Sequence, residues 1–155
     1  MHPQPEPAAA AHSARLVEMI SAQVRASGSI PFSRFMELVL YAPGLGYYSA
    51  GATKFGAAGD FITAPELGPL FAGCVAEATA TVLSALGSGA DLVELGGGSG
   101  VFARDVLTHL AVLGELPARY RILEPSADLR QRQRELLAGA LPAEVMARVE
   151  WLDGP

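Results

Sequence analysis

The residues best suited to chemistry form one short run, Glu94-Leu-Gly-Gly-Gly-Ser-Gly100, in which glycines follow an acidic residue. The apolar segment Leu92–Leu95 leads into these glycines and a helical pattern follows them, so we expect a turn between a strand and a helix. Glycines at such a turn let the backbone approach a ligand closely, and the next helix presents free N–H groups there. The run therefore predicts a nucleotide-like ligand at the carboxyl end of a sheet, cradled by Gly96, Gly98 and Gly100.

Two carboxylates narrow the identity of this ligand. Glu94 lies two residues before the first glycine, where an anion would repel a pyrophosphate but suit a ligand with an ammonium group and a sulfonium. Glu124 ends the next predicted strand, near the spacing of roughly 20 residues at which an acid accepts hydrogen bonds from ribose hydroxyls. Together they favour S-adenosylmethionine as cofactor. Gly98-Ser-Gly-Val-Phe-Ala103 also fits the G-x-G-x-x-A fingerprint, so an oxidoreductase that binds NAD or FAD stays an alternative.

A second group of candidate site residues lies in the segment from Tyr41 to Thr63, which has no clear periodicity. A loop of about 20 residues is uncommon inside a compact domain unless it has a function. We expect the following residues to form a lid or pocket wall, with the acidic one near the ammonium group of the cofactor: Tyr47, Tyr48, Asp60, Phe61 and Thr63. The alternative is that Tyr47 and Phe61 only pack the N-terminal helices onto the sheet.

Hydrophobic periodicity predicts the elements that position these residues. Helices are expected over 12–27, 32–40, 67–86, 101–113 and 128–138, and strands over 92–95, 120–123 and within 145–152. Thr63-Ala-Pro-Glu66 predicts a capping box before the third helix. Strands that alternate with helices predict an α/β fold with a parallel sheet. The predicted divisions are a disordered tail (1–11), a helical extension with the aromatic loop (12–89) and the first part of a Rossmann-like domain (90–155).

Composition argues against several classes of protein. The net charge of −5 provides no basic surface for nucleic acid, and a single cysteine with scattered histidines supports neither a disulfide scaffold nor a metal site. No apolar run approaches the roughly 20 residues of a membrane span, and the N-terminus resembles neither a secretory signal nor a transit peptide. We therefore expect a cytoplasmic bacterial protein without membrane insertion. The oligomeric state is left open.

Four segments together resemble the MidA family of class I methyltransferases, which are related to the mitochondrial complex I assembly factor. They are Ile30–Glu37 (IPFSRFME), Tyr41–Tyr48 (YAPGLGYY), Lys54–Glu66 (KFGAAGDFITAPE) and Glu94–Gly100 (ELGGGSG). The resemblance spans roughly residues 20–153, and the pairing of the second and third segments is its most specific feature. It implies a class I methyltransferase sheet after an N-terminal helical extension, S-adenosylmethionine as cofactor, and methylation of arginine in a protein, a complex I subunit being the implied substrate.

The family's sheet has strands beyond the third, whereas this sequence ends shortly after its third predicted strand. We therefore expect an N-terminal fragment of a methyltransferase, with weak or no catalysis by residues 1–155 alone and with an exposed apolar edge on the first strand. The sequence assigns no catalytic residue and does not give the degree of methylation. Two other classes stay open beside the methyltransferase: the oxidoreductase fragment, and a non-catalytic assembly module that retains the nucleotide-binding fold.

Overall fold

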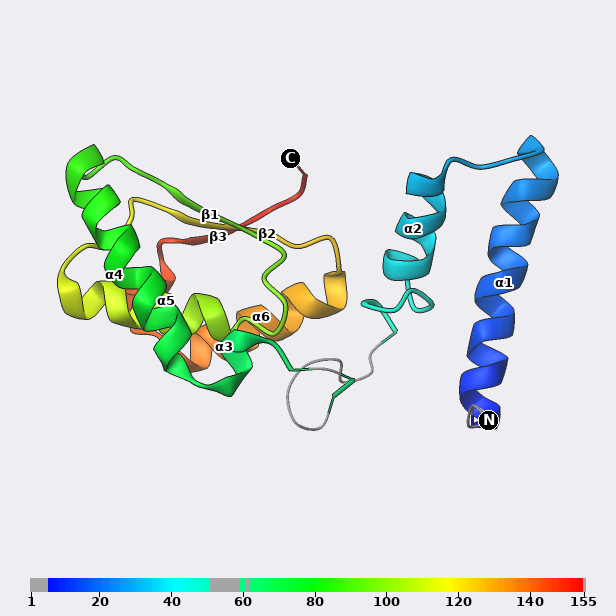
Figure 1. Ribbon diagram of the computed structural model, residues 1–155, viewed down its shortest axis with the longest axis horizontal. Helices are drawn as coiled ribbons and strands as arrows, with labels where there is room; N and C mark the ends of the chain where they lie inside the picture. Colours follow the sequence, from blue (N-terminus) through cyan, green and yellow to red (C-terminus); the bar gives the residue numbers. More distant parts are fainter. Residues whose placement is uncertain (1–5, 51–58, 61, 155) are drawn as a thin grey trace. The chain divides into compact units, whose positions relative to one another are not determined.

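The structure, a computed structural model, describes residues 6–50, 59–60 and 62–154. The chain forms two compact units, Met1–Ala52 and Thr53–Pro155, whose elements are labelled in Figure 1. Helix α4 (Pro69–Leu86) packs along helix α5 (Val101–Leu113), so it lies in the same compact unit as the sheet. The predicted division between residues 89 and 90 remains a prediction.

The first unit contains helices α1 (Pro7–Ser27) and α2 (Phe32–Tyr41). Helix α1 begins at Pro7 rather than at the predicted His12, because proline suits a first turn and the alanines that follow are strong helix formers. Residues 1–5 of the predicted tail lie outside the described residues. His12 Nε2 lies 2.8 Å from the carbonyl oxygen of Leu45, and this hydrogen bond joins α1 to the segment that follows α2.

The second unit is built on a three-stranded sheet. Its elements in chain order are α3 (Ala64–Leu67), α4, β1 (Leu92–Leu95), α5, β2 (Tyr120–Leu123), α6 (Ala127–Ala140), α7 (Ala143–Met146) and β3 (Val149–Leu152). The strands are parallel in the order β1-β2-β3, with Glu94 opposite Ile122 and Ile122 opposite Trp151. The predicted α/β fold with a Rossmann-like parallel sheet is confirmed.

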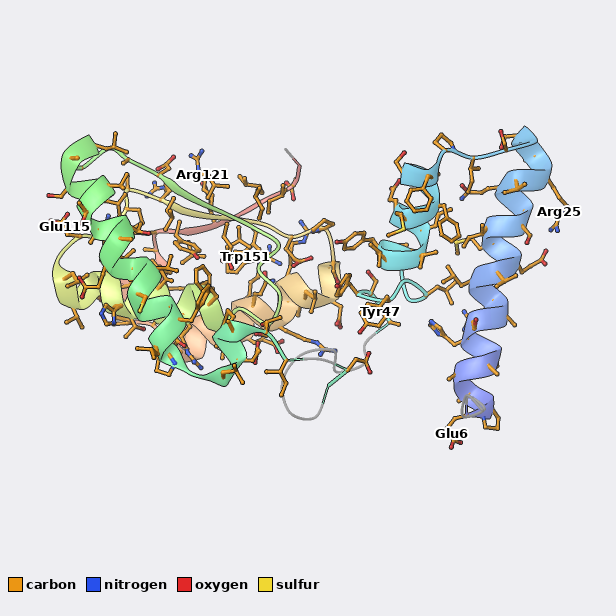
Figure 2. All side chains as sticks on the ribbon, viewed as in Figure 1. Glu6, Arg25, Tyr47, Glu115, Arg121 and Trp151 are labelled. Carbon is orange, nitrogen blue, oxygen red and sulfur yellow. The ribbon has the colours of Figure 1, made fainter. Side chains whose placement is uncertain are left out.

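The sheet has one buried face and one exposed face. Tyr120 and Ile122 of β2 are 1% and 0% exposed, and they pack in a common core with α5 and α6. The alternate positions point the other way, since Val93 and Leu95 of β1 are 50% and 75% exposed. Figure 2 shows the same division, with Trp151 on the side of the helices and Arg121 on the opposite side. Helices α5 and α6 therefore cover the face of the sheet that carries Tyr120 and Ile122.

Helices α4 and α5 meet along a row of small side chains. Ala72, Ala76 and Ala80 of α4 are 1%, 0% and 8% exposed and belong to the core that also contains Ala103 of α5. Small residues at a helix interface allow the two backbones to approach closely. Helix α4 is also long and apolar enough, by length and composition, to cross a membrane, as the core helices of globular proteins can be.

The core predicts that alanine substitutions at two positions on α5 will have very different effects on the free energy of unfolding. Leu110 is 0% exposed and Val112 is 81% exposed. Leu110→Ala should lower the free energy of unfolding by about 2–5 kcal/mol, because it removes buried methyl groups and leaves a cavity. Val112→Ala is the matched control and should change it by less than about 0.5 kcal/mol. Urea unfolding followed by circular dichroism measures both, and equal effects would contradict this assignment of the core.

Candidate functional site

A hollow of about 310 Å³ opens at the carboxyl end of β1. Its wall includes the glycine turn Gly96–Ser99, the acidic Glu94, the rings of Phe71 and Phe102, and the residues Thr63, Pro65 and Glu66. This volume lies at the lower end of the range of about 300–1,000 Å³ that is typical of small-molecule pockets. The carboxyl end of parallel strands is also where α/β sheets bind their ligands. The hollow is therefore the candidate binding site.

The glycine turn has backbone angles that require glycine at the predicted positions. Gly96, Gly98 and Gly100 have φ angles of 78°, 53° and 86°, in the left-handed region. The Gly96 N–H still donates to the Leu123 carbonyl at 2.9 Å, so the turn starts as a continuation of the sheet. Gly96 and Gly98 line the hollow, whereas Gly100 is buried at the start of α5. The structure thus brings two of the three predicted glycines into the wall.

Glu94 lies in the wall, and Tyr120 holds it in place. The Tyr120 hydroxyl donates a hydrogen bond of 2.9 Å to Glu94 Oε2. Burial raises the pKa of Glu94 above its ordinary value, the bond from Tyr120 opposes this rise, and the negative charge of Glu124 adds to it. Burial and the neighbouring Glu94 likewise raise the pKa of Tyr120, which therefore remains a protonated donor. A cationic group in the hollow would offset the cost of ionising Glu94.

Glu124 is buried behind the turn at the end of β2, and its side chain is tied at both oxygens. The residue is 4% exposed, and it is not among the described residues that line the hollow. Its Oε1 accepts from the backbone N–H of Ser126 at 3.0 Å, and its Oε2 accepts from Gln133 Nε2 at 3.4 Å. Gln133 Nε2 also donates to the Gly98 carbonyl at 2.9 Å, so one side chain connects the predicted acid to the glycine turn.

The structure gathers the predicted residues of the aromatic segment only in part. Thr63 lines the hollow beside the glycine turn. Asp60 is exposed, and it is not one of the described residues in the wall. Phe61 lies outside the described residues. Tyr48 belongs to the first unit, where its ring lies 5.7 Å from that of Tyr41 and 4.9 Å from that of Tyr47. The predicted lid remains a prediction.

Sequence reasoning did not assign Glu66, Ser99 or Gln133 to the site. The Ser99 hydroxyl donates to Glu66 Oε1, so Glu66 fastens the glycine turn to α3, and Thr63 makes no side-chain cap there. Glu66 was assigned only to a capping box because its partner is far away in the sequence. Gln133 had a usable signal, since Leu129, Gln133 and Leu137 repeat at four-residue spacing on α6 and are all buried. A polar residue in such a row indicates a buried hydrogen-bonding role.

Comparison with known proteins identifies the family of the chain. The family described as "Putative S-adenosyl-L-methionine-dependent methyltransferase" matches residues 74–154. A Burkholderia thailandensis protein whose crystal structure contains bound S-adenosyl-homocysteine is 46% identical, with a TM-score of 0.81 over 99% of this chain and 41% of that chain.

Two curated relatives are similar as well. The mitochondrial protein arginine methyltransferase NDUFAF7 of Danio rerio is 35% identical over 133 residues, which cover 80% of this chain and 31% of that protein. The NDUFAF7 homolog of Drosophila melanogaster is 39% identical over 111 residues, which cover 69% and 25%. The chain thus spans between a quarter and a third of the length of these relatives. On the match over residues 74–154, the chain belongs to this family of S-adenosylmethionine-dependent methyltransferases, which confirms the resemblance to the MidA family.

Proposed function

We propose that this chain binds S-adenosylmethionine for a methyltransferase whose acceptor is an arginine side chain of a protein. The hollow at the carboxyl end of β1, with the glycine turn and Glu94 in one wall, is the observation that supports this function most directly. A dinucleotide would bring its pyrophosphate to this turn, and the Glu94 carboxylate would oppose that charge. A ligand with an ammonium group fits the same wall.

Different residues of the site would bind different groups of the cofactor. The N–H groups of Gly96 and Gly100 already donate to the Leu123 and Gly97 carbonyls, so the other N–H groups of the glycine turn and those at the start of α5 would hold the polar groups of the cofactor. Glu94, oriented by Tyr120, would bind the ammonium group, and Thr63 would complete the wall of the hollow. When bound, the cofactor supplies a methyl group on a sulfonium, which an acceptor nitrogen displaces in line. The protein contributes position, electrostatic stabilisation and exclusion of water.

Glu124 retains the capacity to bind a ribose. A carboxylate offers about four lone-pair sites. Ser126 and Gln133 occupy one on each oxygen, and this leaves one site on each oxygen for a hydroxyl. Because the residue is only 4% exposed, such a ribose would have to reach it past the glycine turn. We propose the ribose role for Glu124 on this basis.

The acceptor is proposed from the relatives. Both curated relatives described above carry the name of protein arginine methyltransferases, which supports a protein substrate. The resemblance to the MidA family extends this to a subunit of respiratory complex I. We propose that subunit as the first acceptor to assay. Roles for Asp60, Phe61 and Tyr48 as a lid over the cofactor are proposed on the same resemblance.

Calorimetric titration with S-adenosyl-homocysteine, with NADH as the parallel ligand, tests the cofactor. We expect S-adenosyl-homocysteine to bind and NADH to give no heat of binding. Tight binding of NADH alone would instead support the oxidoreductase. Transfer of tritium-labelled methyl groups to arginine, with the product identified by mass spectrometry, tests the activity. A protein that binds the cofactor and methylates no arginine-containing acceptor would be the non-catalytic assembly module.

A further inference from the structure

Gln133 is a fully buried polar side chain that joins three parts of the site. It lies in the middle of α6 and is 0% exposed. Its amide nitrogen donates to the Gly98 carbonyl at 2.9 Å and to Glu124 Oε2 at 3.4 Å. Its amide oxygen accepts from the indole Nε1 of Trp151 on β3 at 2.9 Å. One side chain from a helix therefore contacts the glycine turn, the end of β2 and the third strand.

The chemistry of these partners fixes the orientation of the amide. The indole N–H of Trp151 is only a donor, so it requires the amide oxygen. The Gly98 carbonyl and the Glu124 carboxylate are only acceptors, so both require the amide nitrogen. A flipped amide would place oxygen against oxygen at Gly98 and N–H against N–H at Trp151. Gln133 therefore has one satisfied arrangement.

The glycine turn also packs directly on this side chain. A Cβ added at Gly97 would lie 2.9 Å from Gln133 Nε2, and one added at Gly100 would lie 3.2 Å from Gln133 Cγ. Such separations are too short for ordinary carbon contacts. The absence of side chains at these two glycines thus lets the turn rest on Gln133.

We propose that Gln133 is a positioning residue of the cofactor site, whose amide holds the Glu124 carboxylate and the Gly98 carbonyl in fixed register; the inference rests on the proposed function. Without the amide, Glu124 Oε2 and the Gly98 carbonyl would lose a buried donor, and the carboxylate would be held only at Oε1, by the Ser126 N–H. Buried groups that lose their partner carry a desolvation penalty. Glu124 and the glycine turn would then no longer keep the relative positions that cofactor binding requires.

Gln133→Glu is the sharpest test because it keeps the shape and replaces a donor by an acceptor. The titratable group bonded to the amide is Glu124, which follows β2. Glu94, bonded to Tyr120, interacts electrostatically with Glu124, and the Arg134 guanidinium lies 4.8 Å from the Trp151 ring centroid. A carboxylate at position 133 would face that of Glu124, and two adjacent carboxylates retain one shared proton to higher pH. That proton restores a donor as the pH falls.

The experiment compares dissociation constants for S-adenosyl-homocysteine with the wild-type value at the same pH. Gln133→Glu should bind at least about tenfold more weakly at about pH 8 and recover most of this loss at about pH 5, because the shared proton returns the hydrogen bond. Gln133→Met has a similar volume and no donor, so its loss should persist at both pH values. Gln131→Glu is the matched control, since exposed Gln131 on the same helix donates to the Glu135 carboxylate at 2.7 Å and is not among the described residues that line the hollow.

Trp151 gives an independent readout, since it is the single tryptophan of the chain. Loss of the acceptor at Gln133 should shift its emission in Gln133→Met, and Gln131→Glu should leave it unchanged. Wild-type binding by both Gln133 variants would overturn the proposal, and so would an equal loss at both pH values in Gln133→Glu. Loss of the cooperative thermal transition in both variants would make Gln133 a core residue only, which also overturns it. Failure of the proposed function would appear differently, as no binding by the wild-type chain.

Discussion

Gly97→Ala is expected to abolish measurable binding of S-adenosyl-homocysteine and to lower the free energy of unfolding by about 1–3 kcal/mol. The added Cβ would lie 2.9 Å from Gln133 Nε2 and 2.9 Å from Ile122 Cγ2. Both neighbours are 0% exposed, and the Gln133 amide is held by three hydrogen bonds. Neither can move aside, so the turn itself must shift from its place in the wall of the hollow.

Gly139→Ala on α6 is the matched control for this substitution. A Cβ at Gly139 has no neighbour within 4 Å, and the residue has no positive φ. Alanine there should raise the free energy of unfolding by about 0.5–1 kcal/mol, because glycine is the poorer helix former, and binding should be unchanged. Calorimetry and urea unfolding measure both variants. Wild-type affinity in Gly97→Ala would show that the turn does not need its close contact with α6.

Glu94→Gln should change stability and binding in opposite directions. Burial raises the pKa of Glu94 in the folded chain, so the folded state binds this proton more tightly than the unfolded state does. The associated stability is complete below the pKa of the unfolded chain and is lost as the pH rises through the raised pKa of Glu94. A neutral amide removes this loss, so at neutral pH the variant without cofactor should unfold at a higher temperature than the wild type.

Cofactor binding by Glu94→Gln should be weaker by about tenfold to a hundredfold, because hydrogen bonds to charged groups contribute about 1.5–3 kcal/mol. The wild type should lose affinity for S-adenosylmethionine as the pH falls through the raised pKa of Glu94, and the variant should not. Thermal unfolding and calorimetry over a pH series measure both effects. Glu144→Gln, at an exposed position of α7, serves as control. A variant that is less stable as well as weaker in binding would show that the carboxylate is needed mainly as the partner of Tyr120.

Local patterns were sufficient to predict the sheet and its glycine turn. The strands Leu92–Leu95 and Tyr120–Leu123 are short apolar runs in the sequence. Several glycines between a strand and a helix indicate a tight turn. Glu94 could be predicted because its position depends on the strand that contains it. The family resemblance then gave the cofactor, which neither periodicity nor spacing could identify uniquely.

Long-range contacts account for what the sequence did not reveal. Ser99 and Glu66 are 33 residues apart, and Gln133 and Gly98 are 35 residues apart, so no local pattern pairs them. The packing of helix α4 is another contact of this kind. In the sequence α4 reads as the end of the N-terminal extension, and only its packing against α5 places it in the second compact unit.

The row of alanines between α4 and α5 has a consequence for how substitutions far from the ligand would be felt. Gly100 is the residue that immediately precedes α5, so the packing position of α5 also fixes the position of the glycine turn. A bulkier residue at Ala76 or Ala80 would push α5 away from α4. The start of α5, and with it the glycine turn, would then move relative to the hollow. Random mutagenesis screened for cofactor retention should therefore also yield substitutions at Ala76 and Ala80, which are not among the described residues that line the hollow.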